Sequence, residues 1–99
     1  MLFLVIARDD PARSGERPAH RDRHLAYLRE CGARLKFAGP IRGEDDGPAG
    51  SVFLIEAASE TAARLFAEND PYARAGIFRS CEILPVKPVM GAWLPANGS

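Results

Sequence analysis

The sequence predicts one α+β domain of the ferredoxin-like βαββαβ plan, with a four-stranded antiparallel sheet and two helices on one face. Segments rich in β-forming residues and segments with helical spacing follow one another in that order. The length of 99 residues is also typical of a single domain. We expect the domain to span residues 1–94 and a flexible C-terminal tail to follow over residues 95–99.

The first strand is predicted over residues 2–7, because Leu-Phe-Leu-Val-Ile-Ala is apolar at every position, as in a central strand. The charged segment over residues 8–17 contains Asp-Asp-Pro and Ser-Gly and is predicted to be a loop. Pro18 suits the first turn of a helix, and Gly32, which readily adopts the left-handed conformation, should end that helix. The helical spacing comes from Leu25, Leu28 and Cys31.

A second strand is predicted over residues 34–38, where polar and apolar residues alternate, and Gly39-Pro40 is expected to end it. Such alternation indicates a strand with only one buried face. Turn-forming residues predict a hairpin connection over residues 41–50, followed by a third strand over residues 51–57.

Ser59 is a suitable N-cap for the second helix. This helix should end near Asp70, because a residue that precedes proline avoids the α conformation. Pro71 is expected to open a short helical turn. The fourth strand is predicted over residues 78–84, and Pro85 is expected to end it.

One face of the predicted sheet has no helices to cover it, yet the strands over residues 2–7 and 51–57 are apolar on both faces. We therefore expect a homodimer, in which the uncovered face meets a second copy of the chain. Trp93 and Leu94 are expected to pack back onto the body or onto that partner.

Composition excludes several classes of partner. Thirteen basic and thirteen acidic side chains give a formal net charge of zero, which argues against nucleic-acid binding. The longest apolar run, residues 2–7, is far shorter than the roughly 20 residues that span a bilayer, and no signal-peptide pattern surrounds it. We therefore expect no membrane partner. The two cysteines, Cys31 and Cys81, show no metal-binding spacing and fit a reduced cytoplasmic protein.

Several motifs, taken in order, resemble those of the YciI-like (YCII-related) proteins of the dimeric α+β barrel group. They are the start Met-Leu-Phe-Leu-Val-Ile, Arg21-x-x-His24-Leu-Ala-Tyr-Leu28, Leu35-Lys-Phe-Ala-Gly-Pro40, Gly50-Ser51, Asn69-Asp70-Pro71-Tyr72 and Ala75-Gly76. The resemblance implies a homodimeric ferredoxin-like fold with a His–Asp pair in a cleft. It carries that pair onto His24 and Asp70, and one class of relatives acts as a dehydrochlorinase on a hydroxylated, chlorinated aromatic.

The family often reads Arg-Pro-Ala-His before its leucine, whereas here Arg17-Pro18-Ala19-His20 precedes a second Arg-x-x-His. His20 is therefore an alternative to His24. His24 is favoured because the residues after it and its distance to Gly39-Pro40 both match the family's pattern. The four-residue spacing of the two histidines could hold a metal, but no third ligand is evident, and no metal or other cofactor is expected.

The predicted catalytic residues are His24 as general acid/base and Asp70 as the carboxylate that orients and polarises it. The structural alternatives are a helix-edge histidine bonded to a backbone carbonyl and an aspartate that only caps the short helix. Asp70 could fill both roles, if one carboxylate oxygen caps while the other faces the imidazole.

The predicted substrate-binding residues are Arg21, Ser51 and Tyr72. Arg21 could bind a carboxylate or phenolate through charge-assisted hydrogen bonds, while Ser51 and Tyr72 would line the pocket. Each has a structural alternative: a solvated helix residue, a strand-start residue and a packing residue, respectively.

The leading hypothesis is a cofactor-independent enzyme that acts on a small organic molecule by elimination or isomerisation, as a dehydrochlorinase does. The alternative is a non-catalytic homodimeric module for small-molecule binding or assembly, because nothing in the sequence requires catalysis.

Overall fold

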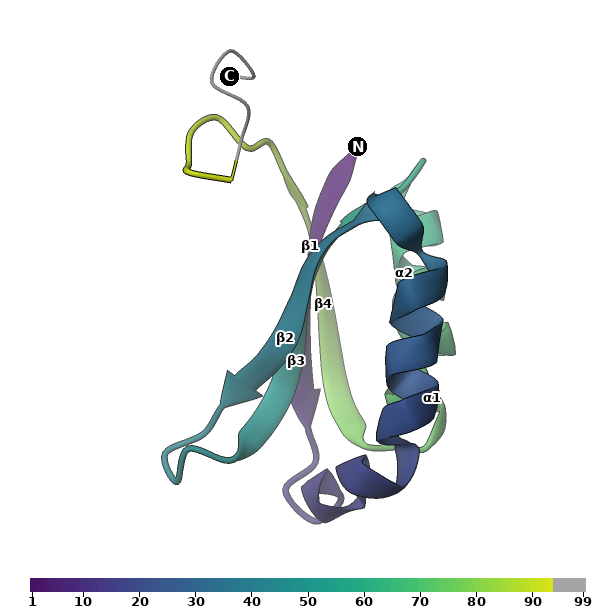
Figure 1. Ribbon diagram of the computed structural model, residues 1–99, viewed down its shortest axis with the longest axis vertical. Coiled ribbons are helices and arrows are strands. Elements are labelled where there is room, and N and C mark those ends of the chain that lie inside the picture. Colours follow the sequence, from purple (N-terminus) through teal and green to yellow (C-terminus); the bar gives the residue numbers. More distant parts are fainter. Residues whose placement is uncertain (94–99) are drawn as a thin grey trace.

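The computed structural model describes residues 1–93 and has the predicted βαββαβ order. Its elements are β1 (Leu2–Asp9), η1 (Ser14–Glu16), α1 (Arg17–Glu30), η2 (Gly32–Arg34), β2 (Leu35–Arg42), β3 (Pro48–Glu56), α2 (Glu60–Asn69), α3 (Pro71–Arg74) and β4 (Phe78–Val86). The strands form one antiparallel sheet in the order β2-β3-β1-β4. Helices cover one face of the sheet and leave the other bare (Figure 1), which confirms the predicted fold class.

The core lies between the sheet and the helices. Alternate residues of the central strands face the helices, and Phe3, Val5, Phe53 and Ile55 are each at most 1% exposed. They form one cluster with Leu28 and Cys31 of the α1 end and with Ala63 and Ala67 of α2. Burying an aliphatic or aromatic side chain contributes about 1.5–3 kcal/mol, so this cluster holds both helices on the sheet.

Two prolines lie inside strands that they were expected to end. Pro40 is within β2, which continues to Arg42, and Pro85 is within β4, which continues to Val86. Both strands are edges of the sheet, and an edge strand has backbone N–H groups without a partner, so proline can be accommodated there. The predicted ends were therefore wrong, and the hairpin connection is shorter than expected, over residues 43–47.

The segment predicted as a loop over residues 8–17 is largely ordered by its contacts. Arg13 Nη2 donates a hydrogen bond to the carbonyl oxygen of Ala75, at 2.7 Å, and Arg13 also pairs with Glu16. Gly76 has a φ of +76°, and a Cβ there would lie 3.1 Å from Arg13 Nη1. The connection from β1 to α1 is thereby attached to the turn between α3 and β4.

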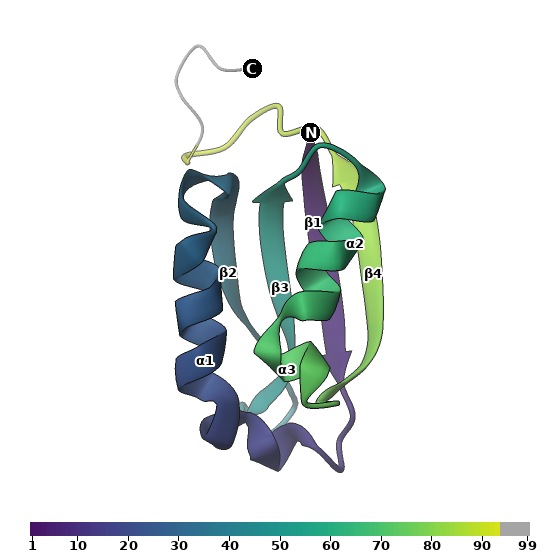
Figure 2. The ribbon, with the colours of Figure 1, turned by 90° about the vertical axis from the view of Figure 1, so that its right-hand side faces the viewer.

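The helix caps follow the sequence signals. Ser59 Oγ accepts from the backbone N–H of Ala62 at 3.1 Å, so it caps α2 as predicted. Asp70 caps α3 in the same way, through the backbone N–H of Tyr72. Gly32 has a φ of +58° directly after α1 ends, which matches the predicted left-handed stop. Figure 2 shows α3 beside the lower half of α1, and Asp70, the cap of α3, contacts His24 of α1.

A tyrosine connects the two long helices. The Tyr27 hydroxyl donates to the carbonyl oxygen of Phe66 at 2.7 Å, and the two rings stack with centroids 5.6 Å apart. Phe66 lies in the last turn of α2, where carbonyls lack helical N–H partners. Burial raises the pKa of Tyr27 to about 12, so the phenol remains a protonated donor at neutral pH.

Tyr27→Phe is expected to lower the free energy of unfolding by about 1 kcal/mol, because the Phe66 carbonyl loses its donor. The folded pKa of about 12 exceeds the ordinary value of 10.0, so this stabilisation is present below pH 10 and is lost as the pH rises towards 12. Urea denaturation of both proteins at several pH values measures the difference. A difference that stays constant up to pH 12 would contradict the assignment.

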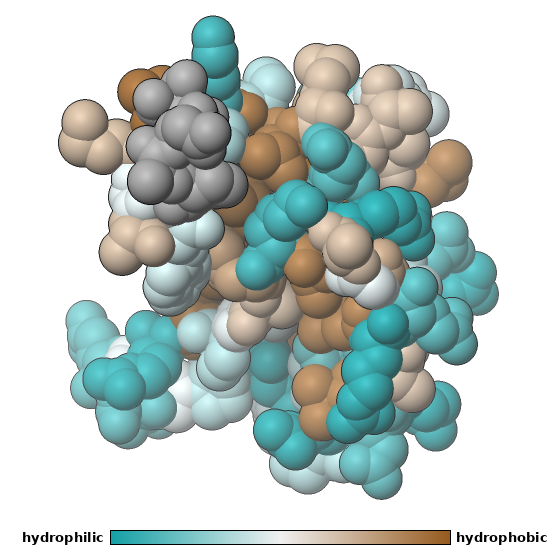
Figure 3. All heavy atoms as spheres, turned by 45° about the horizontal axis from the view of Figure 1, so that its top comes forward, coloured by the Kyte–Doolittle hydropathy of each residue, from teal (hydrophilic) through white to brown (hydrophobic). Residues whose placement is uncertain are grey.

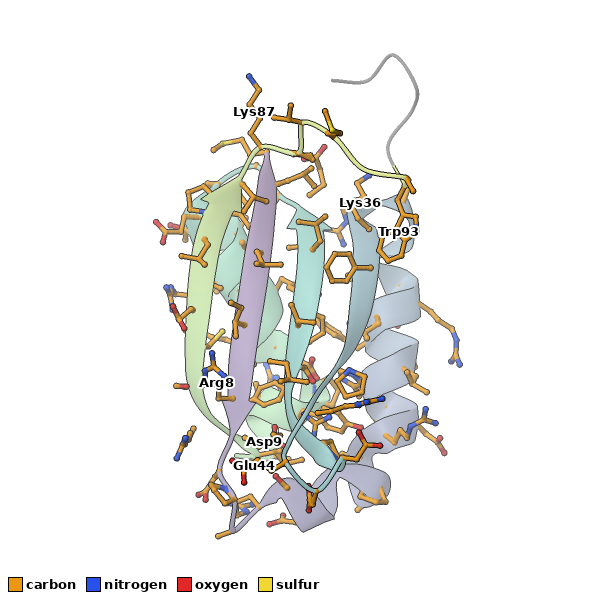
Figure 4. The ribbon with its side chains drawn as sticks, turned by 90° about the vertical axis from the view of Figure 1, so that its left-hand side faces the viewer. Arg8, Asp9, Lys36, Glu44, Lys87 and Trp93 are labelled. Carbon is orange, nitrogen blue, oxygen red and sulfur yellow. The ribbon has the colours of Figure 1, made fainter. Side chains whose placement is uncertain are left out.

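The uncovered face of the sheet is apolar. Leu2, Leu4, Ile6, Val52 and Leu54 are half-buried there, and Leu84 and Val86 are 41% and 37% exposed. Figure 4 views this face directly. Figure 3, an oblique view with the top of the molecule turned forward, shows hydrophobic side chains exposed between hydrophilic ones. This is the surface expected to meet a second copy of the chain.

Leu4→Asp is expected to weaken the predicted dimer at least 100-fold and to yield monomer, because it buries an unpaired charge in the interface. Leu4 lies opposite Leu54 on one side and Leu84 on the other, near the middle of the face. Size-exclusion chromatography with light scattering measures the mass. Leu65→Asp is the matched control, since Leu65 is 53% exposed on α2. A monomeric wild type, or an unchanged Leu4→Asp dimer, would refute the predicted interface.

Candidate active site

A cleft of about 240 Å³ lies between α1 and strands β2 and β3. It is lined by Arg17, Arg21, His24, Leu25, Leu28, Ala38, Gly39, Pro40, Ser51, Phe53 and Tyr72. A wider pocket of about 470 Å³ shares Arg17, Arg21, Pro40 and Tyr72 with it and extends to the β2–β3 hairpin. The lining of this cleft therefore brings together four of the predicted site residues: Arg21, His24, Ser51 and Tyr72.

His24 and Asp70 are in contact. His24 Nδ1 lies 2.8 Å from Asp70 Oδ1, and the two residues are 8% and 0% exposed. Because the carboxylate can only accept, Nδ1 carries the proton and donates it in this hydrogen bond. Nε2 is then the ring nitrogen that remains for a ligand in the cleft, and the carboxylate on Nδ1 fixes the tautomer and the orientation of the ring.

Asp70 caps α3 and contacts His24 with the same oxygen. Oδ1 accepts both from His24 Nδ1 and from the backbone N–H of Tyr72, each at 2.8 Å. The expectation of one oxygen for each role was therefore wrong. Oδ2 is buried without a hydrogen-bond partner in the described part of the chain. The carboxylate is thus committed through one oxygen to the imidazole and to the helix end together.

His20, the alternative histidine, lies outside the cleft lining. It is half-buried on α1, and its Nδ1 contacts the Arg23 guanidinium. The arrangement of side chains favours His24 as the histidine of the site. Within residues 1–93, no three His, Cys, Asp or Glu side chains gather as a metal site requires.

Tyr72 forms part of the same wall. Its ring stacks on the His24 imidazole, with centroids 3.9 Å apart and planes 12° apart, and the residue is 3% exposed. Burial raises the pKa of the Tyr72 phenol, and the nearby Arg17 and Arg21 partly oppose this shift. The stacking restricts the imidazole to the orientation in which Asp70 holds it.

A buried ion pair next to the cleft was missed in the sequence. Arg17 Nε and Nη2 donate to the two carboxylate oxygens of Asp9 at 2.7 and 2.8 Å. Arg17 Nη2 also donates to Ser51 Oγ at 3.1 Å, and Ser14 Oγ donates to Asp9 Oδ2 at 2.8 Å. The Arg17 guanidinium carbon lies 4.8 Å from the Tyr72 ring centroid. Arg17 and Asp9 are 7% and 4% exposed.

One signal in the sequence could have identified Asp9. It follows Phe3, Val5 and Ala7 at two-residue spacing, so it extends the buried face of β1. A carboxylate on a buried face requires a cationic or hydrogen-bonding partner. Arg17, eight residues later, gave no comparable signal, since charged residues in a polar segment are usually solvated.

Arg21 is exposed on α1 and lines both the cleft and the wider pocket. Within residues 1–93 no hydrogen bond or ion pair engages its guanidinium. Its charge is therefore available to an anionic group that enters through the wider pocket. The substrate-binding role predicted for Arg21 is compatible with this position.

A third pocket, of about 540 Å³, lies on the uncovered face of the sheet. It is lined by Leu2, Lys36, Phe37, Leu54, Pro88, Met90, Gly91, Ala92 and Trp93. Trp93 contacts Phe37 edge-on, with centroids 6.0 Å apart, but remains 85% exposed (Figure 4). This pocket has no acid–base pair, so the His24 cleft is the candidate site. Leu94 and the predicted tail over residues 95–99 lie outside the described residues.

Residues 1–87 match the YCII-related domain. The chain belongs to the YCII-related family. It is 33% identical over 97 residues to protein YciI of Escherichia coli, covering 90% of this chain and 99% of that protein. It is 40% identical over 77 residues to derivative of benzaldehyde biosynthesis cluster protein C of Emericella nidulans, covering 71% and 76%.

A solved structure of another protein is similar over nearly the whole chain. It is the 5-chloro-2-hydroxyhydroquinone dehydrochlorinase of Burkholderia phenoliruptrix, in complex with 2,5-dihydroxybenzoquinone. The identity is 34% and the TM-score 0.80, and the match covers 88% of this chain and 94% of the dehydrochlorinase. This YCII-related chain therefore shares its fold with an enzyme that binds a small cyclic molecule.

No helix in residues 1–93 is both long and apolar enough to cross a membrane.

Proposed function

We propose that this YCII-related protein is a cofactor-independent enzyme that eliminates from, or isomerises, a small hydroxylated ring compound by acid–base chemistry. The observation that carries the proposal is the 2.8 Å contact between His24 Nδ1 and Asp70 Oδ1, with His24 in the lining of the cleft and Asp70 fully buried. The likeness to a dehydrochlorinase supports elimination as the reaction class.

The size and lining of the cleft favour a planar ring. Apolar cavities of about 150 Å³ hold benzene, so a cleft of about 240 Å³ leaves room for a ring with a few substituents. Leu25, Leu28 and Phe53 supply apolar contacts to the faces and edges of such a ring. Polar groups come from His24, Ser51 and Arg21, and these would contact hydroxyl or oxo substituents.

In the proposed elimination, His24 Nε2 accepts a proton from an O–H or C–H group of the substrate. The electron pair of that bond forms a new double bond, and the leaving group departs with its own bonding pair. A proton and an anion such as chloride are lost, with no oxidation or reduction. Asp70 stabilises the imidazolium that forms, because its carboxylate already accepts from Nδ1.

The other site residues act on charge and position. Arg21 would help to neutralise negative charge that develops on the ring oxygens, since it lines both the cleft and the wider pocket and has no carboxylate partner in the described part of the chain. Tyr72 holds the imidazole by stacking.

We place the enzyme in the cytoplasm. Within residues 1–93 Cys31 and Cys81 form no disulfide, which suits a reducing environment.

The test is to incubate the wild-type protein with 5-chloro-2-hydroxyhydroquinone and measure chloride release against the uncatalysed rate. Chloride should appear in a one-to-one ratio with the dechlorinated quinone. Binding of 2,5-dihydroxybenzoquinone is measured in parallel by its change in visible absorbance. Binding without any acceleration of chloride release would reject this elimination and favour the non-catalytic binding module.

A further inference from the structure

Ser51 has an unused hydrogen-bond donor in the wall of the cleft. It lies in β3 and is 2% exposed. Its Oγ accepts a hydrogen bond from Arg17 Nη2 at 3.1 Å. A serine hydroxyl has one proton and two acceptor lone pairs, and a guanidinium can only donate. Arg17 therefore occupies a lone pair and leaves the Ser51 proton, which has no acceptor within residues 1–93.

Arg17 is held rigidly in the position that produces this arrangement. Two of its nitrogens bond both carboxylate oxygens of Asp9, and this bidentate geometry fixes the plane of the guanidinium. The Tyr72 ring lies beneath the guanidinium carbon at 4.8 Å, and Ser14 supports Asp9 from the other side. The pair is buried, so solvent does not compete for these bonds.

We propose that Arg17 is a positioning residue, which orients the Ser51 hydroxyl so that it donates a hydrogen bond to an oxygen atom of the bound ligand. This inference rests on the proposed function and names the ligand class more closely. The cleft would select planar molecules that present an acceptor oxygen, as a phenolate, enolate or carboxylate, to Ser51. The same molecule would present its acidic proton to His24 Nε2.

The roles proposed for His24 and Ser51 are chemically complementary. Proton removal by His24 Nε2 increases the negative charge on a conjugated oxygen of the ligand. A hydroxyl that is already oriented towards this oxygen stabilises the charge without reorganisation of the protein. Ser51 forms no covalent bond in this scheme. Arg17 remains paired with Asp9 throughout and acts on the ligand through Ser51.

The experiment measures the Kd of two probes for the full chain by titration. One probe is 2,5-dihydroxybenzoquinone and the other is benzoate, a planar carboxylate with no leaving group. Ser51→Ala is expected to weaken the binding of both about tenfold, the worth of one charge-assisted hydrogen bond. Ser80→Ala, at an exposed serine of β4, is the matched control and should bind like the wild type.

A double-mutant cycle tests the positioning role. Arg17→Lys keeps the charge but cannot bond Asp9 and Ser51 in the same fork, so it should also weaken binding about tenfold. The Arg17→Lys/Ser51→Ala protein should bind no more weakly than either single variant, because both changes remove the same contact. Asp9→Asn replaces Arg17→Lys in the cycle if circular dichroism shows that the lysine variant does not fold.

Each outcome of these measurements supports or overturns the inference. Equal affinities of the wild type and Ser51→Ala would overturn the inference, as would a wild type that binds neither probe. Losses that multiply in the double variant would show that Arg17 acts independently of Ser51, and would overturn its positioning role. Benzoate binding that depends on Ser51, with no quinone binding or chloride release, would support the inference and reject the proposed function.

Discussion

Replacing His24 with alanine is expected to lower turnover in the proposed elimination by about 10²- to 10⁴-fold, the usual contribution of a general base. The reason is geometric: Asp70 occupies Nδ1 at 2.8 Å, which leaves Nε2 in the cleft to accept the substrate proton. Chloride release at saturating substrate measures the effect as kcat. Circular dichroism and the Kd for 2,5-dihydroxybenzoquinone check that the fold and the cleft survive.

His20→Ala is the matched control for this prediction. His20 lies four residues earlier on the same helix but outside the cleft lining, and it contacts Arg23 instead of a carboxylate. Turnover should remain at the wild-type level. If His24→Ala retained full turnover, or if His20→Ala abolished it, His24 would not be the base.

Asp70→Asn separates the negative charge of the carboxylate from its helix-capping role. An asparagine can still accept from the backbone N–H of Tyr72, so α3 should remain capped. In that orientation the same oxygen still accepts from His24 Nδ1, but the negative charge that stabilises the imidazolium is gone, which lowers kcat with little effect on ligand affinity. Wild-type kcat in Asp70→Asn would leave Asp70 with the cap alone.

Arg17→Ala is expected to lower the free energy of unfolding by about 3–5 kcal/mol, because it leaves the Asp9 carboxylate buried without its charge partner. The Asp9 side chain is 1% exposed, and both of its oxygens bond Arg17 at present. A loss of this size is a large part of the total stability of a small domain. Denaturant unfolding followed by circular dichroism measures it.

The exposed pair between Arg42 and Asp46 supplies the control. Its nitrogen–oxygen distance is also 2.7 Å, but its side chains are 71% and 72% exposed. Arg42→Ala should change stability by no more than about 1 kcal/mol, since water and salt screen such a pair. Similar effects of Arg17→Ala and Arg42→Ala would show that burial adds nothing to the Asp9–Arg17 pair.

A combined change tests the same reasoning from the other direction. Replacing Asp9 by leucine and Arg17 by methionine removes both charges together and keeps the volume apolar. This double variant should be more stable than Arg17→Ala alone, because neither charge is left buried without a partner. The double variant should also lose the hydrogen bond from Arg17 to Ser51. Ser51 would then no longer be oriented towards the ligand, and ligand binding should weaken.

Much of the fold and part of the site can be predicted from local signals. Ser59 and Asp70 cap helices because short polar side chains satisfy the N–H groups that follow them, whatever the rest of the chain does. The apolar run of β1 marks a central strand for an equally local reason. His24 and Asp70 were predicted as a pair from the resemblance to the family, and the structure brings them into contact.

The missed features depend on positions far apart in the sequence. Whether Pro40 or Pro85 ends a strand depends on the strand order β2-β3-β1-β4, which makes both strands edges. Whether Arg17 is solvated or buried depends on Asp9 at the end of β1 and on Ser51, which is 34 residues further along. No short window of sequence contains the strand order or the contact between Arg17 and Ser51.

The sequence alone therefore determined the order of the helices and strands, the helix caps, the apolar character of the central strands and the resemblance to the family. Each of these follows from residues close together along the chain or from a motif read in order. Only the tertiary structure decided which carboxylate oxygen meets His24, which charges are buried and which hydroxyl is left with a free proton. Hydrogen bonds and ion pairs have lengths of about 3 Å and strict directions, so they are settled only where distant segments pack together.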